Sequence, residues 1–174
     1  MIEKIKDLIS DSLSSRRRKL FCVIAASVAV IYLSLAIGAA ATKSPWCDEA
    51  WFASPAFNLS TRGFMGTTVL ESSGTWLEGI DEYTYWIPPA YVLAQSGWYE
   101  VFGFSLLSMR SLSAAFGLLA LFSWFFFVKD ITGEVETAIL ALVVIALDYC
   151  FIMTASVGRM DMMSAALNIA AFAA

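Results

Sequence analysis

Long apolar blocks alternate with polar stretches along the chain. Residues 20–41 contain 22 consecutive positions without a charge; as a helix they rise about 33 Å, enough to cross a bilayer core of about 30 Å. Residues 110–128 and 137–157 form similar blocks, and a shorter one occupies residues 162–174. The pattern predicts an all-α polytopic membrane protein with three full transmembrane helices and the start of a fourth. Because the last block is too short to span, we expect this chain to be the N-terminal part of a larger protein.

Composition supports the membrane class and narrows the chemistry. Hydrophobic residues make up 59% of the chain and charged residues 15%, with a mean hydropathy of +0.72, which is unusual for a soluble domain. The net charge is −4 without a basic patch beyond the N-terminus, so nucleic acid is not an expected partner. The lack of histidine and the scattered cysteines without CxxC spacing argue against a structural zinc site or a disulfide framework. We expect no metal ligands and no cofactor, and whether a divalent ion assists is left open.

The charges that flank the first apolar block predict its orientation. Residues 1–19 form a polar, amphipathic lead, either a helix on the inner membrane surface or a cytoplasmic tail, and end in the basic cluster "RRRK". By the positive-inside rule, the N-terminus is cytoplasmic in a multi-pass protein of the plasma (inner) membrane. Residues 42–109 are then a long outer loop with interfacial helices. Their seven acidic residues, two basic residues and five tryptophans fit an outer interfacial belt.

The side on which the later loops lie depends on residues 87–109. If this stretch spans the membrane, Arg159 and Asp161 face the cytoplasm, opposite Asp48. If it lies in the interface, all three emerge on the outer side. The stretch contains Glu100, and a charge near the centre of a spanning helix costs about 2.5–3.5 kcal/mol on insertion scales. We therefore favour an interfacial helix, which makes residues 129–136 a cytoplasmic loop and residues 158–161 an outer loop.

Three short motifs follow one another in this predicted order. They are "DEAWF" after the first span, "WIPPAYVLAQSGWYEVFG" at residues 86–103, and "VGRMDMM" after the third span. Their order and membrane placement resemble the N-terminal part of the type-C glycosyltransferases, in particular the group of protein O-mannosyltransferases and bacterial aminoarabinose and Rgt-type transferases. The resemblance covers about the whole chain. The family's later helices and soluble domain have no counterpart in this sequence, so we expect the chain alone to be inactive.

The resemblance implies an enzyme with a lipid-linked donor. Such an enzyme transfers a sugar from a polyprenyl-phosphate carrier to a hydroxyl of a glycan, lipid or protein acceptor on the outer face of the membrane, usually with inversion. Asp48 matches the acidic residue of the family's active centre, with Glu49 as its neighbour. Arg159 and Asp161 match the arginine and aspartate near the same cleft.

The reaction needs a base, which a positioned carboxylate can supply for a gain of typically 10²–10⁴-fold. On a helix, adjacent side chains point about 100° apart, so Asp48 and Glu49 cannot both face one proton. We expect Asp48 to be the general base, and Glu49 to bind the acceptor or brace the loop. The structural alternative is that both acids stabilise a helix N-terminus, with Asp48 as its cap.

The departing polyprenyl phosphate is an anion that needs cationic donors. Arg159 is the first candidate, followed by Lys43 and Arg62. Asp161 would orient Arg159 or contact the acceptor. Alternatively, Arg159 is an interfacial anchor or simply pairs with Asp161.

Asp148 lies inside the third apolar block, where an acid is a functional candidate by default. We expect it to be protonated and hydrogen-bonded to a neighbouring helix. Two other function classes remain open: a transporter or channel segment that uses Asp48, Asp148 and Asp161 as a proton or cation path, and a non-catalytic membrane anchor or assembly subunit. Transporters usually bind near the bilayer midplane, whereas these acids mostly gather towards one surface, which favours the enzyme.

Overall fold

The computed structural model describes residues 2–70, 73, 76–84 and 87–173, with side chains described from residue 15 onward except residue 18. Within these residues the chain forms only helices, without strands. The seven helices are α1 (Ile2–Thr42), α2 (Cys47–Arg62), α3 (Pro89–Phe102), α4 (Leu106–Thr132), α5 (Val135–Ala146), α6 (Tyr149–Ala155) and α7 (Asp161–Phe172). The all-α class expected from the sequence is confirmed.

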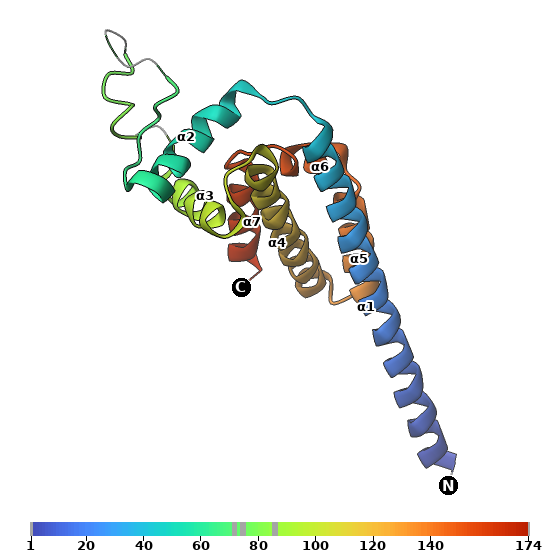
Figure 1. The fold of residues 1–174 in the computed structure, drawn as a ribbon. Coiled ribbons are helices and arrows are strands. Elements are labelled where there is room, and N and C mark those ends of the chain that lie inside the picture. The colour runs from blue at the N-terminus through green and yellow to red at the C-terminus, as the bar shows by residue number, and fades with distance from the viewer. Residues whose placement is uncertain (1, 71–72, 74–75, 85–86, 174) are drawn as a thin grey trace.

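Helices α1, α4, α5 and α7 form an elongated bundle, and α2 and α3 lie to one side of its upper end (Figure 1). Among the residues that the structure describes, two helices are long and apolar enough to cross a membrane: the part of α1 from Ser15 to Thr42, and α4. Helices α5 and α6 form a third candidate only as a bent pair, with an angle of 64° at the break between them. Three straight spans are therefore not what the described residues form, and α7, with 12 residues, rises only about 18 Å.

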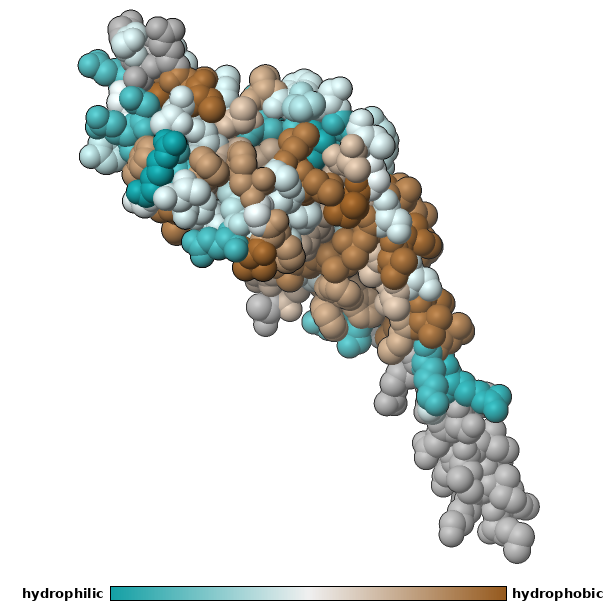
Figure 2. Space-filling view, in the orientation of Figure 1, coloured by the Kyte–Doolittle hydropathy of each residue, from teal (hydrophilic) through white to brown (hydrophobic). Residues whose placement is uncertain are grey.

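Helix α1 runs without interruption from the polar lead into the apolar block. A helix lying flat on the membrane surface would need a bend between these two parts, and the structure has none there (Figure 1). Hydrophobic residues cover much of the visible side of the bundle, while hydrophilic residues gather at its upper end and near the point where the bundle meets the N-terminal extension (Figure 2).

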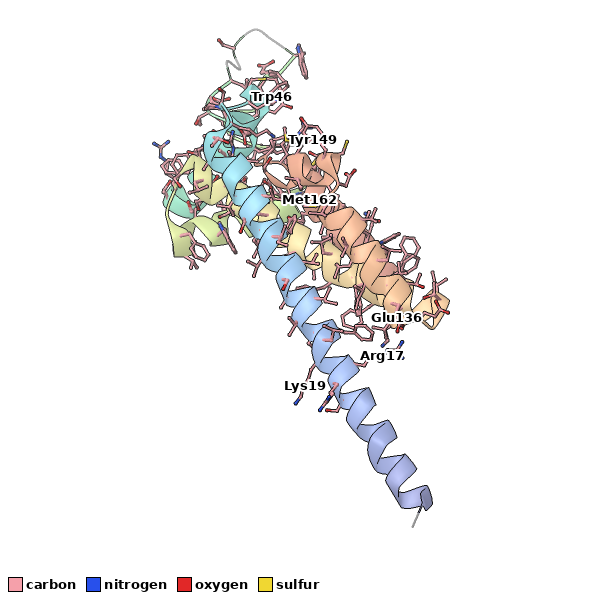
Figure 3. All side chains as sticks on the ribbon, turned by 90° about the vertical axis from the view of Figure 1, so that its right-hand side faces the viewer. Arg17, Lys19, Trp46, Glu136, Tyr149 and Met162 are labelled. Atoms are coloured by element: carbon pink, nitrogen blue, oxygen red, sulfur yellow. The ribbon has the colours of Figure 1, made fainter. Side chains whose placement is uncertain are left out.

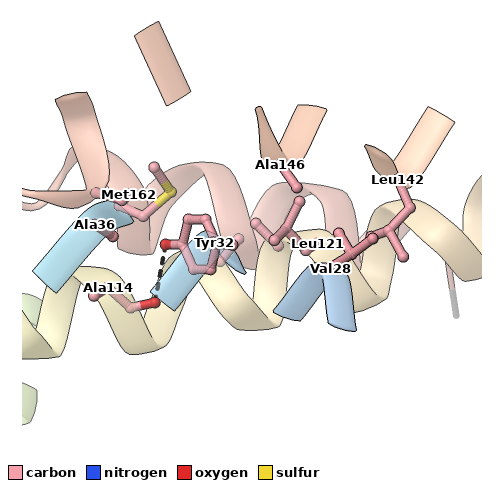
Figure 4. Packing of buried hydrophobic residues seen from close by; sticks show 11 residues of the cluster. Val28, Tyr32, Ala36, Ala114, Leu121, Leu142, Ala146 and Met162 are labelled. Carbon is pink, nitrogen blue, oxygen red and sulfur yellow. Dashed lines mark hydrogen bonds between the residues drawn. The ribbon is translucent and has the colours of Figure 1, made fainter. Parts of the chain in front are cut away.

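One core holds the bundle together. It contains Val28, Tyr32 and Ala36 of α1, which pack against residues of α4, α5 and α7 (Figure 4). The Tyr32 hydroxyl donates a hydrogen bond to the Ala114 carbonyl at 3.0 Å. This bond pairs a buried hydroxyl with a neighbouring helix, as a polar group inside an apolar bundle requires. Gly117 leaves the room that the Tyr32 ring occupies, since a Cβ at that position would collide with the ring.

A second core attaches α2 and α3 to the start of α4. Phe52 and Ala56 of α2 pack with Tyr91 and Val92 of α3 and with Leu112 of α4. Helix α3 has 14 residues, which rise about 21 Å and are too few to cross a bilayer core of about 30 Å. Pro88 and Pro89 stand at its N-terminus, where a missing N–H costs nothing. The geometry therefore agrees with a non-spanning helix in this part of the chain.

Candidate functional site

Four segments that lie between or at the ends of helices meet at the upper end of the bundle. Helix α1 ends just before Pro45, which lacks an N–H and disfavours helix in the residue before it. Helix α2 then starts at Cys47, with Asp48 and Glu49 in its first turn. The loop between α6 and α7, residues 156–160, and the start of α4 meet these segments through the contacts described below.

Asp48, Arg159 and Asp161 form one charged cluster. Nη1 of Arg159 lies 3.0 Å from Oδ2 of Asp48, and Nε of Arg159 lies 3.0 Å from Oδ2 of Asp161. The Arg159 guanidinium also lies over the Phe52 ring, 5.8 Å from its centroid. The side chains of Arg159, Asp48 and Asp161 are 36%, 26% and 47% exposed, so the cluster is open to solvent or to a ligand. The structure thus brings together residues separated by more than 110 positions.

Lys43 contacts the end of α6 and the first residue of the loop between α6 and α7. Its ammonium donates to the Ser156 hydroxyl at 3.0 Å and to the Met153 carbonyl at 3.4 Å. Burial, and secondly the charge of Arg110, lower the pKa of Lys43, while Glu49 acts in the opposite direction. The amine is therefore held by neutral oxygens at the end of α6.

A cavity of about 520 Å³ is lined by Lys43, Arg159 and Asp161, among other residues. Its wall is formed by the segment between α1 and α2, by α4, and by α6 with the loop that follows and the start of α7. The lining residues are Lys43, Ser44, Trp46, Arg110, Met153, Thr154, Val157, Arg159 and Asp161. Asp48 is not part of this wall. The volume falls within the range of about 300–1,000 Å³ that small-molecule sites occupy.

Glu49 is buried and fully engaged. Its Oε1 accepts from Nε of Arg110 and from the Gly158 N–H, both at 2.8 Å. Its Oε2 accepts from Nη2 of Arg110 at 2.7 Å and from the Trp46 N–H at 2.9 Å. Burial alone would raise the pKa of Glu49, but the hydrogen bonds from Arg110, Gly158 and Trp46 outweigh it and hold the pKa below its usual value. This geometry favours the bracing role for Glu49 and leaves Asp48 as the candidate base.

Arg110 is the residue that sequence reasoning missed. It is 1% exposed, and all five of its N–H donors are used: two on Glu49 and three on the carbonyls of Ala40, Lys43 and Ser44. These carbonyls lie in the last turn of α1 and in the two residues that follow it, where a helix leaves acceptors without internal partners. A signal was present, because Arg110 is the only basic residue between Arg62 and Lys129 and is the first residue of the apolar block 110–128.

Two other expected residues do not join the cluster. Arg62 is exposed in the last turn of α2, 14 residues and thus about 21 Å along the helix from Asp48. Asp148 is exposed and caps α6, with Oδ1 accepting from the Phe151 N–H at 2.7 Å. The expected hydrogen bond from Asp148 to a neighbouring helix is therefore wrong: the chain breaks at this position, and the carboxylate satisfies the next helix's N-terminus.

Metal ligands are not assembled in the part of the chain that the structure describes: no group of three or more His, Cys, Asp or Glu side chains there could hold a metal ion. The chain matches no protein-family model, no curated protein and no solved structure. Its function is therefore inferred from its own residues and from the resemblance of its motifs.

Proposed function

We propose that the protein is the acceptor-activating part of a membrane glycosyltransferase with a polyprenyl-phosphate sugar donor. The observation that carries this proposal is the contact of Asp48 with Arg159 beside a cavity whose wall contains both Arg159 and Lys43. A carboxylate, two cations and an open cavity at one end of an apolar bundle match the needs of sugar transfer from an anionic lipid.

The chemistry assigns one step to each group. The oxygen of the acceptor hydroxyl attacks the anomeric carbon, and Asp48 takes the proton of that hydroxyl. The bond between the anomeric carbon and the phosphate oxygen breaks on the opposite face, which inverts the configuration. The leaving polyprenyl phosphate is an anion that Lys43 and Arg159 stabilise. Asp161 orients the Arg159 side chain.

The membrane supplies the second substrate-binding surface. In this proposal the basic end of α1 lies on the cytoplasmic side and the cluster lies in the outer leaflet, where the headgroup of a lipid donor would be found. The exposed apolar side chains Leu93, Val101 and Phe102 of α3 face the acyl chains from the interface.

One observation favours a transporter instead. Transporter sites use interrupted helices near the bilayer midplane, and the break between α5 and α6 is such an interruption. However, Tyr149, the first residue of α6, lies towards the same end of the bundle as Trp46 (Figure 3). Asp148 is also occupied as a helix cap. Both facts fit a surface site better than a central ion path.

The test is sugar transfer in membranes of cells that make the full-length protein, with a panel of labelled polyprenyl-phosphate sugars. Asp48→Asn keeps the shape of the side chain but cannot accept the proton, so transfer should fall by about 10²–10⁴-fold. Membrane insertion should be unchanged, which a protease-protection pattern identical to wild type would show. Arg62→Gln serves as the control, because Arg62 lies outside the cluster. Wild-type turnover by Asp48→Asn would rule out Asp48 as the base.

A further inference from the structure

Arg159 stands between the cavity and Asp48. Its side chain forms part of the cavity wall and at the same time touches Asp48, which does not reach the wall. Oδ2 of Asp48 is the oxygen that Nη1 of Arg159 approaches. The guanidinium thus engages one oxygen of the carboxylate on the side of the cavity, while the Asp48 side chain as a whole stays 26% exposed.

The backbone around Arg159 is anchored by hydrogen bonds, whereas its side chain is held by two partly exposed ion pairs and the Phe52 ring. The neighbouring Gly158 N–H is fixed by Glu49 at 2.8 Å, and the Arg159 carbonyl accepts from the Ser113 hydroxyl at 3.3 Å. By contrast, Nε of Arg159 has no well-directed hydrogen bond among the described residues, although Asp161 lies within ion-pair distance. Among the donors of the guanidinium, Nε is thus a buried one whose hydrogen-bonding capacity the present arrangement does not fully use.

An anion in the cavity would compete with Asp48 for these donors. Asp161 is the only acid on the cavity wall described above, whereas Lys43 and Arg159 both present positive charge there. Two non-bridging oxygens of a phosphate ester, whether monoester or diester, can accept two parallel charge-assisted hydrogen bonds from a guanidinium. A partly exposed ion pair such as Asp48–Arg159 changes an equilibrium constant by only about fivefold or less. Replacing Asp48 by a phosphate as the partner of Arg159 therefore costs little free energy.

We propose that Arg159 shields Asp48 until an anionic phosphate ester enters the cavity, and that the phosphate then draws Arg159 away and frees the carboxylate. This inference rests on the proposed function, since it makes loading of the donor the event that exposes the general base. The shared chemistry of the ligand is the phosphate group of a lipid ester, a diester in the sugar donor and a monoester in the leaving carrier, which farnesyl phosphate reproduces. A lipid carrier and a free phosphate are distinguished by the probes below.

The experiment measures binding of farnesyl phosphate to the purified chain in detergent by titration calorimetry. Because Asp48 competes with the anion, Asp48→Asn should tighten binding by about two- to fivefold. In the Arg159→Gln background the same change should have no effect, since the competition is gone. Asp130→Asn is the charge-matched control. Asp130 is exposed and lies on α4, 20 residues after Arg110, which corresponds to about 30 Å along the helix.

Three results would overturn the shielding. The first is an equal increase in affinity from Asp48→Asn in both backgrounds, which would indicate long-range charge alone. The others are an unchanged affinity in both backgrounds and no binding of farnesyl phosphate by the wild-type chain. Circular dichroism and gel filtration verify that each variant is folded. Inorganic phosphate is the second probe. Should it bind as tightly as farnesyl phosphate and show the same variant pattern, the shielding stands and the lipid-donor proposal fails.

Discussion

At the scale of single residues, Glu49 and Arg110 have the most demanding surroundings. Both are buried, and their charges are compensated by each other and by hydrogen bonds to the backbone at the end of α1, the start of α2 and the loop before α7. Removing one partner of such a pair leaves an uncompensated buried charge, at a cost of about 3–5 kcal/mol. The pair therefore determines whether the segments that carry Asp48 and Arg159 stay together.

Stability should depend on pH through Glu49. The pKa of Glu49 is lower in the folded chain than in the unfolded chain, where it lies at about 4.3. The contribution of Glu49 to the free energy of unfolding is thus fully present above the unfolded-state pKa. It is lost as the pH falls from that value towards the lower pKa of the folded chain. Thermal unfolding in detergent should show this loss in the wild-type chain. Glu49→Gln should lower stability at neutral pH by about 3–5 kcal/mol and flatten the acid limb. An unchanged acid limb in Glu49→Gln would assign the pH dependence to another group.

The roles of these residues were only partly predictable. The acids Asp48 and Glu49 stand out because they closely follow an apolar block, and their divergent directions on a helix agree with a partly exposed Asp48 and a buried Glu49. Arg110 does not stand out in the same way, since its five acceptors lie on segments 61 or more residues away. Local spacing carries no information about such partners, so the pair emerges only from the three-dimensional arrangement.

At the scale of elements, the break between α5 and α6 differs most from expectation. Residues 137–157 are apolar enough for one span, but the chain turns by 64° where Leu147 and Asp148 leave the helix. Asp148 is a favourable N-cap, because its carboxylate accepts from a free N–H of the next helix. An acid inside an apolar block is thus a signal for a helix start as well as for a functional charge.

The cap and the ion-path interpretations of Asp148 predict different outcomes. Asp148→Asn retains an acceptor for the Phe151 N–H and should leave stability nearly unchanged, whereas Asp148→Ala should lose about 1 kcal/mol. Chemical unfolding monitored by tryptophan fluorescence would compare the two. If Asp148 instead carried protons or cations, Asp148→Asn would abolish ion flux into proteoliposomes. Flux that is present in the wild type and lost in Asp148→Asn would contradict the cap as its main role.

At the scale of the whole molecule, the two ends of the bundle differ in chemistry. One end carries Arg17, which pairs with Glu136 across α1 and α5 (Figure 3). The other carries the cluster and its cavity. The pair offsets one of the acidic charges of residues 130–136, because Glu136 lies beside the basic cluster of α1. The placement of the apolar blocks was predictable from hydropathy; the contacts between their ends were not.

The orientation in the membrane can be tested with native cysteines. Cys47 is exposed next to Asp48, so a variant that retains Cys47 alone, with Cys22→Ala and Cys150→Ala, should react with an impermeant maleimide added to intact cells. A variant without native cysteines that contains Glu134→Cys should react only after the membrane is opened. Mass-shift gels would measure both. Labelling of Cys47 only after opening would place the cluster in the cytoplasm and contradict an outer-leaflet donor site.

Each end of the bundle has an arginine–glutamate ion pair, one exposed to solvent and the other buried. The side chains of Arg17 and Glu136 are 64% and 50% exposed, so dissolved ions weaken their attraction, whereas those of Arg110 and Glu49 are 1% and 2% exposed and are largely insulated from salt. High ionic strength should therefore weaken the Arg17–Glu136 pair and leave the Arg110–Glu49 pair almost unchanged. Salt sensitivity is thus expected at the end of the bundle that lies away from the proposed sugar-transfer site.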